Sequence, residues 1–564
     1  MPDSSIDRRS RSRGMYVTRL LGIFLVSLVG LAVCDQGRAR STLSPLNVEA
    51  FGARGDGIAL DTPALQAAID AASKRGGGTV QLEAGHTYLS GTLHMRSNVT
   101  LHIPAGATLL GSLHRMDYSR AANRAPITDP EVTTNRPDYR RSGYLALILA
   151  EHVHDIAITG RGVINGQGLA LANDARRLLA EGVLTDPTFA TSRPAEINRP
   201  MLLLVTHSEN VRVTGITLRN SSSYVQNYDH SSHVLVDGIH VDSTAYWNND
   251  GLQISDSSHV RVLNSFINSA DDGICFKSED PHGVTEDVVI ENNTVRSSAN
   301  ALKFGTASQG TFRHIRVSGL QVHDTFRSAV ALEVVDGGTL EDVVIDGVDA
   351  RNTGNALFIR LGARAQGRPP GTLRNVTIRN LRAQIPLGAP DAGYPMSGPL
   401  PTEAHNLFPS SITGLPGHPV QNVTLENIAI TFGGGGATWR ADRPLDALAS
   451  VPEQASGYPE FSMFGELPAW GLYVRHVDGL KMRNVHLTLQ TPDYRPALVA
   501  DDTRGLAVDT LRVAGPAVGK LSGAPALALR RTDVTAMKGL DVPAGAMPIR
   551  RIGAQESLKN GSSP

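Results

Sequence analysis

Three aspartates stand at a spacing that could bring their carboxylates together. Asp271 and Asp272 are adjacent, and Asp250 precedes Asp272 by 22 residues. Carboxylates held close together cannot all ionise freely, so at least one pKa should rise and leave a carboxylic acid beside carboxylates near neutral pH. That asymmetry suits glycoside hydrolysis, in which one carboxyl group protonates the leaving oxygen while another acts on water or as a nucleophile. The same residues could instead be corner residues that bond their own backbone.

Other polar residues continue at a similar interval along the chain. The candidates for contacts with a substrate are Asn248, Asn300, Lys303, Arg327, Glu333 and Arg360. Asn300 could equally be an asparagine stacked inside the fold, whereas Glu333 and Arg360 are expected to line a groove. Isolated aspartates such as Asp256 and Asp346 are expected to be turn residues. Three histidines are expected to be surface or loop residues: His230, His314 and His405.

A repeated pattern explains why this interval matters. The pattern consists of two short stretches in which apolar residues alternate with other residues, separated by a Gly or Asn. Its copies begin at Val211, Val234, Val260, Val288, Ile315, Val343, Val376 and Val423. The first six starts are 23 to 28 residues apart, which is one turn of a wide β-solenoid. With no helical period between the short strands, the pattern predicts an all-β, right-handed parallel β-helix whose coils stack at ~4.8 Å. Residues one coil apart then lie above each other.

The ends of the solenoid and its interruptions can also be placed. Asp61-Thr62-Pro63 followed by Leu65, Ile69 and Ala72 predicts a short N-terminal capping helix, with Asp61 as the capping residue. We expect a single catalytic domain over residues 41–541 and a flexible tail over 542–564. Two insertions, at about 386–419 and 433–470, are expected to wall a groove because long loops in a solenoid are commonly functional.

The first 40 residues read as an export segment with a linker. Several arginines precede an apolar run over residues 20–33, which is shorter than the ~20 residues of a membrane span. Met15 could be the true start. Cys34 follows a sequence similar to a bacterial lipobox, so a membrane tether through its lipidation is conceivable. The segment predicts an exported protein that is periplasmic, extracellular or anchored to the outer membrane of a bacterium.

Composition narrows the function classes further. The formal net charge is −1, so the protein as a whole has no positive electrostatic field that would attract nucleic acid. We therefore expect no nucleic acid as a partner. Only two cysteines occur, so neither a disulfide framework nor a thiolate zinc site is expected. No phosphate-binding loop, metal-binding helix motif or Ser/His/Asp order stands out, and we expect no cofactor and no metal. The protein is expected to be a monomer.

At these residues the chain resembles glycoside hydrolase family 28, which comprises polygalacturonases and rhamnogalacturonan hydrolases. The likeness runs from Val48 to about Leu487, and its strongest part is NNDGLQISDSSHVRVLNSFINSADDGICFKS, which mirrors the family's N-T-D and D-D-C-I-A-I-K-S. The resemblance implies that Asp271 is the general acid, that Asp250 and Asp272 activate water, and that the mechanism is inverting without a metal. It also implies a pectic polysaccharide or oligosaccharide as substrate.

Two departures from the family pattern concern the sugar at the cleaved bond. Where polygalacturonases have G-H-G, this chain has Asn300 between two alanines, and Glu333 stands in the probable place of the lysine of R-I-K. A glutamate there would repel a galacturonate. We therefore expect either that Lys303, Arg327 and Arg360 take over anion binding, or that the sugar is neutral, such as the rhamnose of rhamnogalacturonan.

Two other functions are compatible with a β-solenoid. A pectate-type polysaccharide lyase would usually need a calcium cluster and a basic residue near the uronate. A non-catalytic carbohydrate-binding solenoid would keep its function when Asp271 is replaced by Asn, whereas a hydrolase should lose about 10²–10⁴-fold in rate. The three aspartates favour the hydrolase.

Overall fold

The computed structural model describes residues 43–122, 143–186, 193–390, 404–437, 444–516, 518 and 524–553. The chain divides into compact units of residues 1–43 and 44–564, and all elements below belong to the second unit. The predicted export segment and Cys34 lie outside the described residues, as does the end of the predicted tail. Among the described residues, no helix is both long and apolar enough to cross a membrane.

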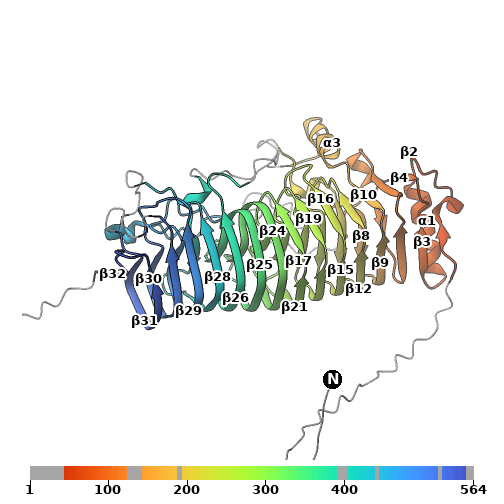
Figure 1. Ribbon diagram of the computed structural model, residues 1–564. Coiled ribbons are helices and arrows are strands. Elements are labelled where there is room, and N and C mark those ends of the chain that lie inside the picture. Colours follow the sequence, from red (N-terminus) through yellow and green to blue (C-terminus); the bar gives the residue numbers. More distant parts are fainter. Residues whose placement is uncertain are drawn as a thin grey trace, which may run out of the picture. The chain divides into compact units, whose positions relative to one another are not determined.

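The unit of residues 44–564 is a right-handed parallel β-helix, as the repeat predicted, and its coils stack along three sheets (Figure 1). The first sheet begins with β1 (Leu46–Asn47), β3 (Gly78–Gln81), β6 (Val99–Ile103), β9 (His154–Gly160), β12 (Glu209–Thr214), β15 (Ser232–Asp237), β18 (Ser258–Leu263) and β21 (Val284–Glu291). The second begins with β2 (Asp56–Leu60), β4 (Thr87–Ser90), β7 (Thr108–Gly111), β10 (Val163–Asn165), β13 (Thr217–Arg219), β16 (His240–Ser243), β19 (Phe266–Ser269) and β22 (Thr294–Ser297).

The third sheet, which carries the candidate site, begins with β5 (Leu93–His94), β8 (Ala146–Glu151), β11 (Met201–Thr206), β14 (Gln226–Asp229), β17 (Leu252–Ser255), β20 (Ile274–Ser278) and β23 (Leu302–Ser308). Further along, longer strands contribute to more than one sheet: β24 (Thr311–Val334), β25 (Thr339–Leu361), β26 (Thr372–Ile385), β28 (Val420–Phe432), β29 (Leu472–Leu489), β30 (Leu498–Ala514) and β31 (Leu527–Asp541). Short strands β27 (Ser410–Thr413) and β32 (Ile549–Ile552) extend the third sheet.

The register of the first sheet follows the sequence repeat. Val211 pairs with Val234, and the later starts of the pattern pair in turn through Val423. Alternate residues of each strand point inward, where valine, isoleucine and leucine form one continuous core. Phe276 and Phe304 stack in this core with ring centroids 4.2 Å apart. The other alternate residues point outward and are available for chemistry.

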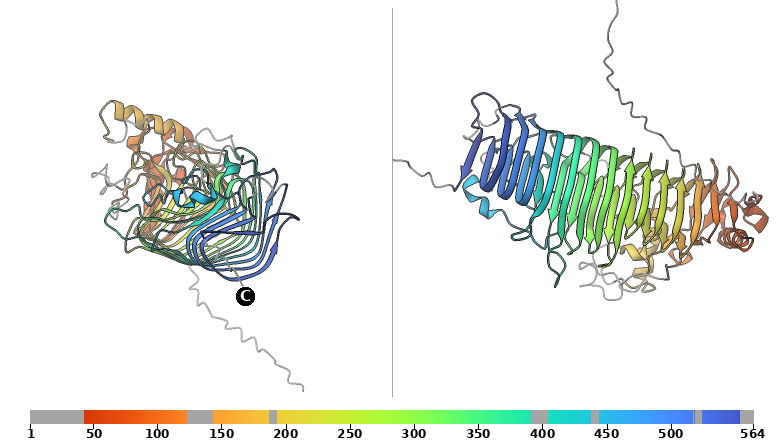
Figure 2. Two further views of the ribbon diagram at one scale, coloured as in Figure 1. Left: turned by 90° about the vertical axis from the view of Figure 1, so that its left-hand side faces the viewer. Right: turned by 90° about the horizontal axis from the view of Figure 1, so that it is seen from below.

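Helix α1 (Thr62–Lys74) covers one end of the solenoid and buries Leu65, Ile69 and Ala72, as predicted (Figure 2). The predicted side-chain cap by Asp61 is wrong, because its carboxylate does not bond to the helix. It accepts instead from the backbone N–H groups of Arg54 and Gly55 at 2.7 and 3.1 Å. The two loop donors therefore use the oxygens that would otherwise cap the helix.

Several predicted irregular segments contain regular structure. Within 386–419 the chain forms the 3₁₀ turn η6 (His405–Leu407) and strand β27. Within 433–470 it forms the 3₁₀ segment η8 (Leu445–Ser450). Strand β32 lies within the predicted tail, where Ile549 pairs with Leu527. The remaining elements are helix α3 (Gly168–Ala180) and the 3₁₀ turns η1 (Val48–Phe51), η2 (Arg115–Asp117) and η5 (Glu196–Asn198).

Candidate active site

The three aspartates lie at the start of two paired strands of the third sheet. Asp250 precedes β17, and Asp271 and Asp272 precede β20. The backbone N–H of Gly251 donates to the carbonyl of Asp272 at 2.8 Å, which fixes one turn above the other. The coil repeat thus brings residues about 22 positions apart in sequence to the same edge of the sheet.

Asp250 is held by outward-facing side chains of the neighbouring strands. Only 2% of its surface is exposed, and its Oδ2 accepts from Lys277 Nζ at 2.7 Å and from Gln253 Nε2 at 2.8 Å. The Cys275 thiol also lies 3.5 Å from this oxygen. Cys275 is fully buried, but its thiol contacts Asp250 and the residue is not part of the apolar core that contains its neighbour Phe276.

Asp272 is held in its charged form. It is 3% exposed, its Oδ2 lies 3.0 Å from Lys303 Nζ, and its Oδ1 accepts from Asn300 Nδ2 at 2.8 Å. Desolvation alone would raise the pKa of Asp272, but the charges of Lys303 and Lys277 and the hydrogen bond from Asn300 outweigh it and lower the pKa.

Asp271 has the opposite electrostatic environment. Desolvation of its carboxyl group, followed by the negative charges of Asp250 and Asp272, raises the pKa of Asp271 to about 7. The residue as a whole is half-buried. The backbone N–H of Asp272 donates to its Oδ1 at 2.9 Å. Near neutral pH the site therefore combines a carboxylic acid with an adjacent carboxylate.

An open cleft lies beside this site along the third sheet, although the three aspartates are not among the residues that line it. Gln253 and Lys277, which hold Asp250, both line it, and the ring of Tyr224 lies 4.5 Å from Lys277 Nζ. The other lining residues come mainly from β11, β14 and β17 and from the turns that follow them. The cleft thus extends from Gln253 and Lys277, the two partners of Asp250, toward the amino-terminal coils.

Beyond Lys303 the same face of the sheet is covered by residues 444–470. Phe461 and Phe464 from this segment pack in an apolar cluster with Phe358 and Tyr473 of the sheet. The hydroxyl of Tyr458 lies 3.5 Å from Lys303 Nζ. A polymer lying on this face would meet the segment just past the carboxylates.

The structure brings some of the predicted binding residues to the carboxylates. Asn300 and Lys303 contact Asp272 directly. Arg327 is buried nearby, with its Nε 3.6 Å from Glu460 Oε2. Asn248 is half-buried and lies two residues before Asp250, and its side-chain oxygen accepts a hydrogen bond from Arg199 at 2.9 Å.

The prediction that Glu333 and Arg360 line the groove is wrong. They are 0% and 1% exposed. Arg360 donates to the backbone carbonyls of Glu453 and Gln454 at 2.7 and 3.1 Å, so it holds the covering segment in place. Glu333 Oε2 lies 3.9 Å from Lys303 Nζ, and desolvation raises the pKa of Glu333 to about 8.

Sequence reasoning missed Lys277, Gln253 and Tyr224. Two of them could have been found from the alternation of inward- and outward-facing residues along a strand. Gln253 and Lys277 lie on the outward face of β17 and β20, as Cys275 does. The positions of Tyr458 and of residues 444–470 could not be found in this way, because an insertion outside the repeat has no period that places it against particular strands. His405 was expected on the surface or in a loop; it is buried against Phe326, with ring centroids 4.5 Å apart.

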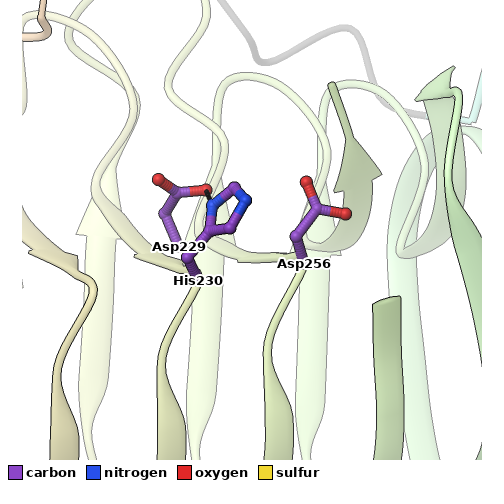
Figure 3. Close-up of side chains that lie close together, drawn as sticks. All are labelled: Asp229, His230 and Asp256. Atoms are coloured by element: carbon purple, nitrogen blue, oxygen red, sulfur yellow. Dashed lines mark hydrogen bonds and ion pairs between the residues drawn. The ribbon is translucent and has the colours of Figure 1, made fainter. Parts of the chain in front are cut away.

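A second group of polar residues lies in the wall of the cleft. Asp229 is the last residue of β14 and His230 follows it, whereas Asp256 follows the end of the next strand, β17 (Figure 3). One ligand-type atom from each side chain lies within 4.8 Å of the other two. Asp256 has a φ of 45°, which agrees with the turn residue expected there, and His230, which was expected to be a surface or loop residue, has a φ of 44°. Their side chains nevertheless converge.

Comparison with known proteins shows which protein family the chain is similar to. Residues 94–335, which include all three aspartates, match the sequence model of glycosyl hydrolases family 28. Over this stretch, which is less than half of the chain, the sequence is similar to that family. Residues 46–109 match a second model, described as rhamnogalacturonase A/epimerase, pectate lyase-like. These matches support glycosidase activity.

The individual relatives are distant. A probable polygalacturonase of Vitis vinifera is 26% identical over 355 residues, covering 59% of this chain and 68% of the relative. An exo-poly-alpha-D-galacturonosidase of Dickeya chrysanthemi is 26% identical over 258 residues, and this chain spans only 41% of its length. The fold is shared with a hyperthermoactive exopolygalacturonase from Thermotoga maritima, at a TM-score of 0.53 and 21% identity over 69% of this chain and 87% of that one.

Proposed function

We propose that the chain hydrolyses glycosidic bonds in pectic polysaccharide, with Asp271 as the general acid. The observation that carries this proposal is the pair of opposite electrostatic environments at Asp271 and Asp272. A general acid works best when its pKa lies near the working pH, and its partner must stay ionised to accept a proton. The site offers both states on two adjacent residues.

In the proposed reaction, Asp271 donates its proton to the leaving glycosidic oxygen as the bond breaks. Asp250 and Asp272 orient a water molecule and accept the proton that it loses on attack. Water attacks the face opposite the leaving group, so the anomeric configuration inverts. Lys277 and Lys303 keep the two accepting carboxylates charged, and no metal ion takes part in this chemical step.

The charges around the site favour a neutral sugar at the cleaved bond. Lys277 is paired with Asp250, and Lys303 is paired with Asp272. Arg327 faces Glu460. With these cations already facing carboxylates, a uronate at the cleaved bond would meet mainly negative charge. We propose a rhamnogalacturonan-type substrate, in which a neutral sugar can occupy this position and an acidic one can lie next to it.

The covered face beyond Lys303 supports attack from a chain end. Residues 444–470 leave the cleft open toward the amino-terminal coils but fill the sheet face on the other side. A polysaccharide could enter by its end but could not run across the site. We therefore propose exo action, with the protein acting outside the cytoplasm, as the predicted export segment would require.

The proposal is tested by incubating the purified protein with rhamnogalacturonan, polygalacturonate and small synthetic glycosides. We expect new reducing ends from rhamnogalacturonan at a rate well above that from polygalacturonate. Fast cleavage of polygalacturonate would contradict the neutral-sugar assignment. Products that absorb in the ultraviolet would instead identify a lyase.

A further inference from the structure

We propose that Asp229, His230, Asp256 and Asp280 form a binding site for a divalent cation of the zinc or manganese class in the wall of the cleft. The first three residues meet at the ends of β14 and β17, as Figure 3 shows. Asp280 follows β20, the next strand, and its Oδ2 lies 3.6 Å from His230 Nε2. The site is thus built by three consecutive coils.

The histidine is already oriented as a metal ligand would be. His230 Nδ1 and Asp229 Oδ1 are 2.9 Å apart, so the Nδ1–H can donate to the carboxylate. That hydrogen bond leaves Nε2 to face Asp280. A metal-bound histidine usually donates its other ring N–H to a carboxylate, which fixes both the tautomer and the ring plane.

The spacing of the possible ligands is close to that of a coordinated ion. Two ligands at ~2.1 Å from one tetrahedral ion are roughly 3.4 Å apart, which approximates the separation between His230 Nε2 and Asp280 Oδ2. The ligand-type atoms of Asp229, His230 and Asp256 lie within 4.8 Å of one another, so the three side chains must move closer together to bind one ion. Histidine with carboxylates suits zinc or manganese better than calcium, which prefers oxygen ligands alone.

Asp256 supplies a separate reason to expect a cation. Its surface is only 8% exposed, and it accepts hydrogen bonds from the Ser278 hydroxyl and from the backbone N–H of Asp280. Among the described residues it has no ion-pair partner within 4.0 Å. A buried carboxylate normally pairs with a cation or coordinates a metal, because removing its charge from water is costly. Here the adjacent groups are Asp229, Asp280 and the single imidazole of His230.

An ion in this site would change what the cleft can bind. Gln253 and Lys277 line the same cleft and contact Asp250, so a sugar chain that reaches Asp250 passes the proposed ion. The ion would present positive charge to a uronate carboxylate in an otherwise acidic wall. This role in substrate binding rests on the proposed function, whereas binding of the ion itself does not.

The site is tested by titrating chelator-treated, full-length protein with ZnCl₂, and separately with MnCl₂ and CaCl₂, in a calorimeter. We expect one equivalent of zinc or manganese to bind, more tightly than calcium. Asp256→Asn and His230→Gln should each raise the Kd at least about tenfold. Because Asp256 is buried, Asp280→Asn serves as a variant in a more exposed position that should also weaken binding.

The matched control is His233→Gln. His233 stacks on His259 with ring centroids 4.7 Å apart and lies 3.8 Å from Glu209, but this pair is exposed and does not line the cleft. We expect it to leave zinc binding unchanged. No saturable binding by the wild type, or wild-type affinity in both Asp280→Asn and Asp256→Asn, would overturn the site. If zinc binds but no pectic substrate is cleaved, the proposed function fails and the cation site stands.

Discussion

The ammonium group of Lys303 lies 3.0 Å from the carboxylate of Asp272. Both side chains are almost fully buried, so this ion pair rather than solvent keeps Asp272 charged. Removal of one partner from a buried pair leaves an uncompensated charge, which costs about 3–5 kcal/mol. The carboxylate that is proposed to accept a proton from water therefore depends on a lysine from the next coil.

Replacement of Lys303 by Met should move the pH dependence of catalysis. Without the ammonium group, the pKa of Asp272 should rise, so activity at low pH should fall and the acidic limb of the kcat profile should shift to higher pH. The profile of Lys303→Met would be compared with that of Lys481→Met, which alters an exposed lysine on β29. An acidic limb in the same place as in wild type would argue against this role for Lys303.

Replacement of Glu333 by Gln should stabilise the protein in a pH-dependent way. The folded-state pKa of Glu333 is raised to about 8 by desolvation, above the ~4.3 of an unfolded glutamate. The folded state therefore binds this proton more tightly, and the stability that protonation contributes is lost as pH rises toward 8. Gln does not titrate, so the Tm of the variant relative to wild type should increase between pH 5 and pH 9.

The control for this measurement is Glu426→Gln, since Glu426 lies half-exposed on β28. Its Tm relative to wild type should change much less over the same pH range. If Glu333→Gln instead became less stable than wild type as pH rose, Glu333 would be an ionised partner of Lys303 and the neutral assignment would be wrong.

The rate of hydrolysis should fall as pH rises through about 7. Asp271 must carry a proton to act as the acid, and its pKa is raised to about 7. Asp272 must be ionised, and its pKa is lowered, so activity should persist on the acidic side until pH falls below the ordinary aspartate range. The measurement is kcat against pH from 4 to 9. A rate that increased from pH 6 to pH 8 would rule out Asp271 as the acid.

Because residues 444–470 are proposed to close one end of the cleft, the products of digestion should show exo action. Exo action releases one small product from the start, and the viscosity of the polymer falls slowly relative to the appearance of reducing ends. Both quantities can be followed in the same digest of rhamnogalacturonan. An early ladder of oligosaccharides with a rapid loss of viscosity would show that residues 444–470 do not block the polymer.

The sequence allowed the fold and the core of the site to be predicted because both depend on the coil period. Val211 and its later counterparts pair as their spacing indicated, and Asp250 and Asp272 lie one coil apart. Arg360 was placed wrongly because its surroundings depend on residues 444–470, which lie far away in sequence. An insertion outside the repeat carries no periodic signal that shows which strands it will cover.

The cluster around His230 shows another limit of the sequence. A positive φ at Asp256 agrees with the turn residue that was expected there. The turn conformation of such a residue does not show what its side chain contacts, because those contacts come from the corners of the neighbouring coils. Convergence of Asp229, His230 and Asp256 arises from that stacking and is visible only once the coils are in register.

The proposed chemistry is tested most directly by the kcat of Asp271→Asn on a rhamnogalacturonan oligosaccharide, measured beside wild type and a correctly folded Asp346→Asn control. We predict a loss of about 10²–10⁴-fold for Asp271→Asn, the usual contribution of general acid catalysis, and no comparable loss for the control. An Asp271→Asn variant that hydrolysed the oligosaccharide at the wild-type rate would contradict the proposed mechanism.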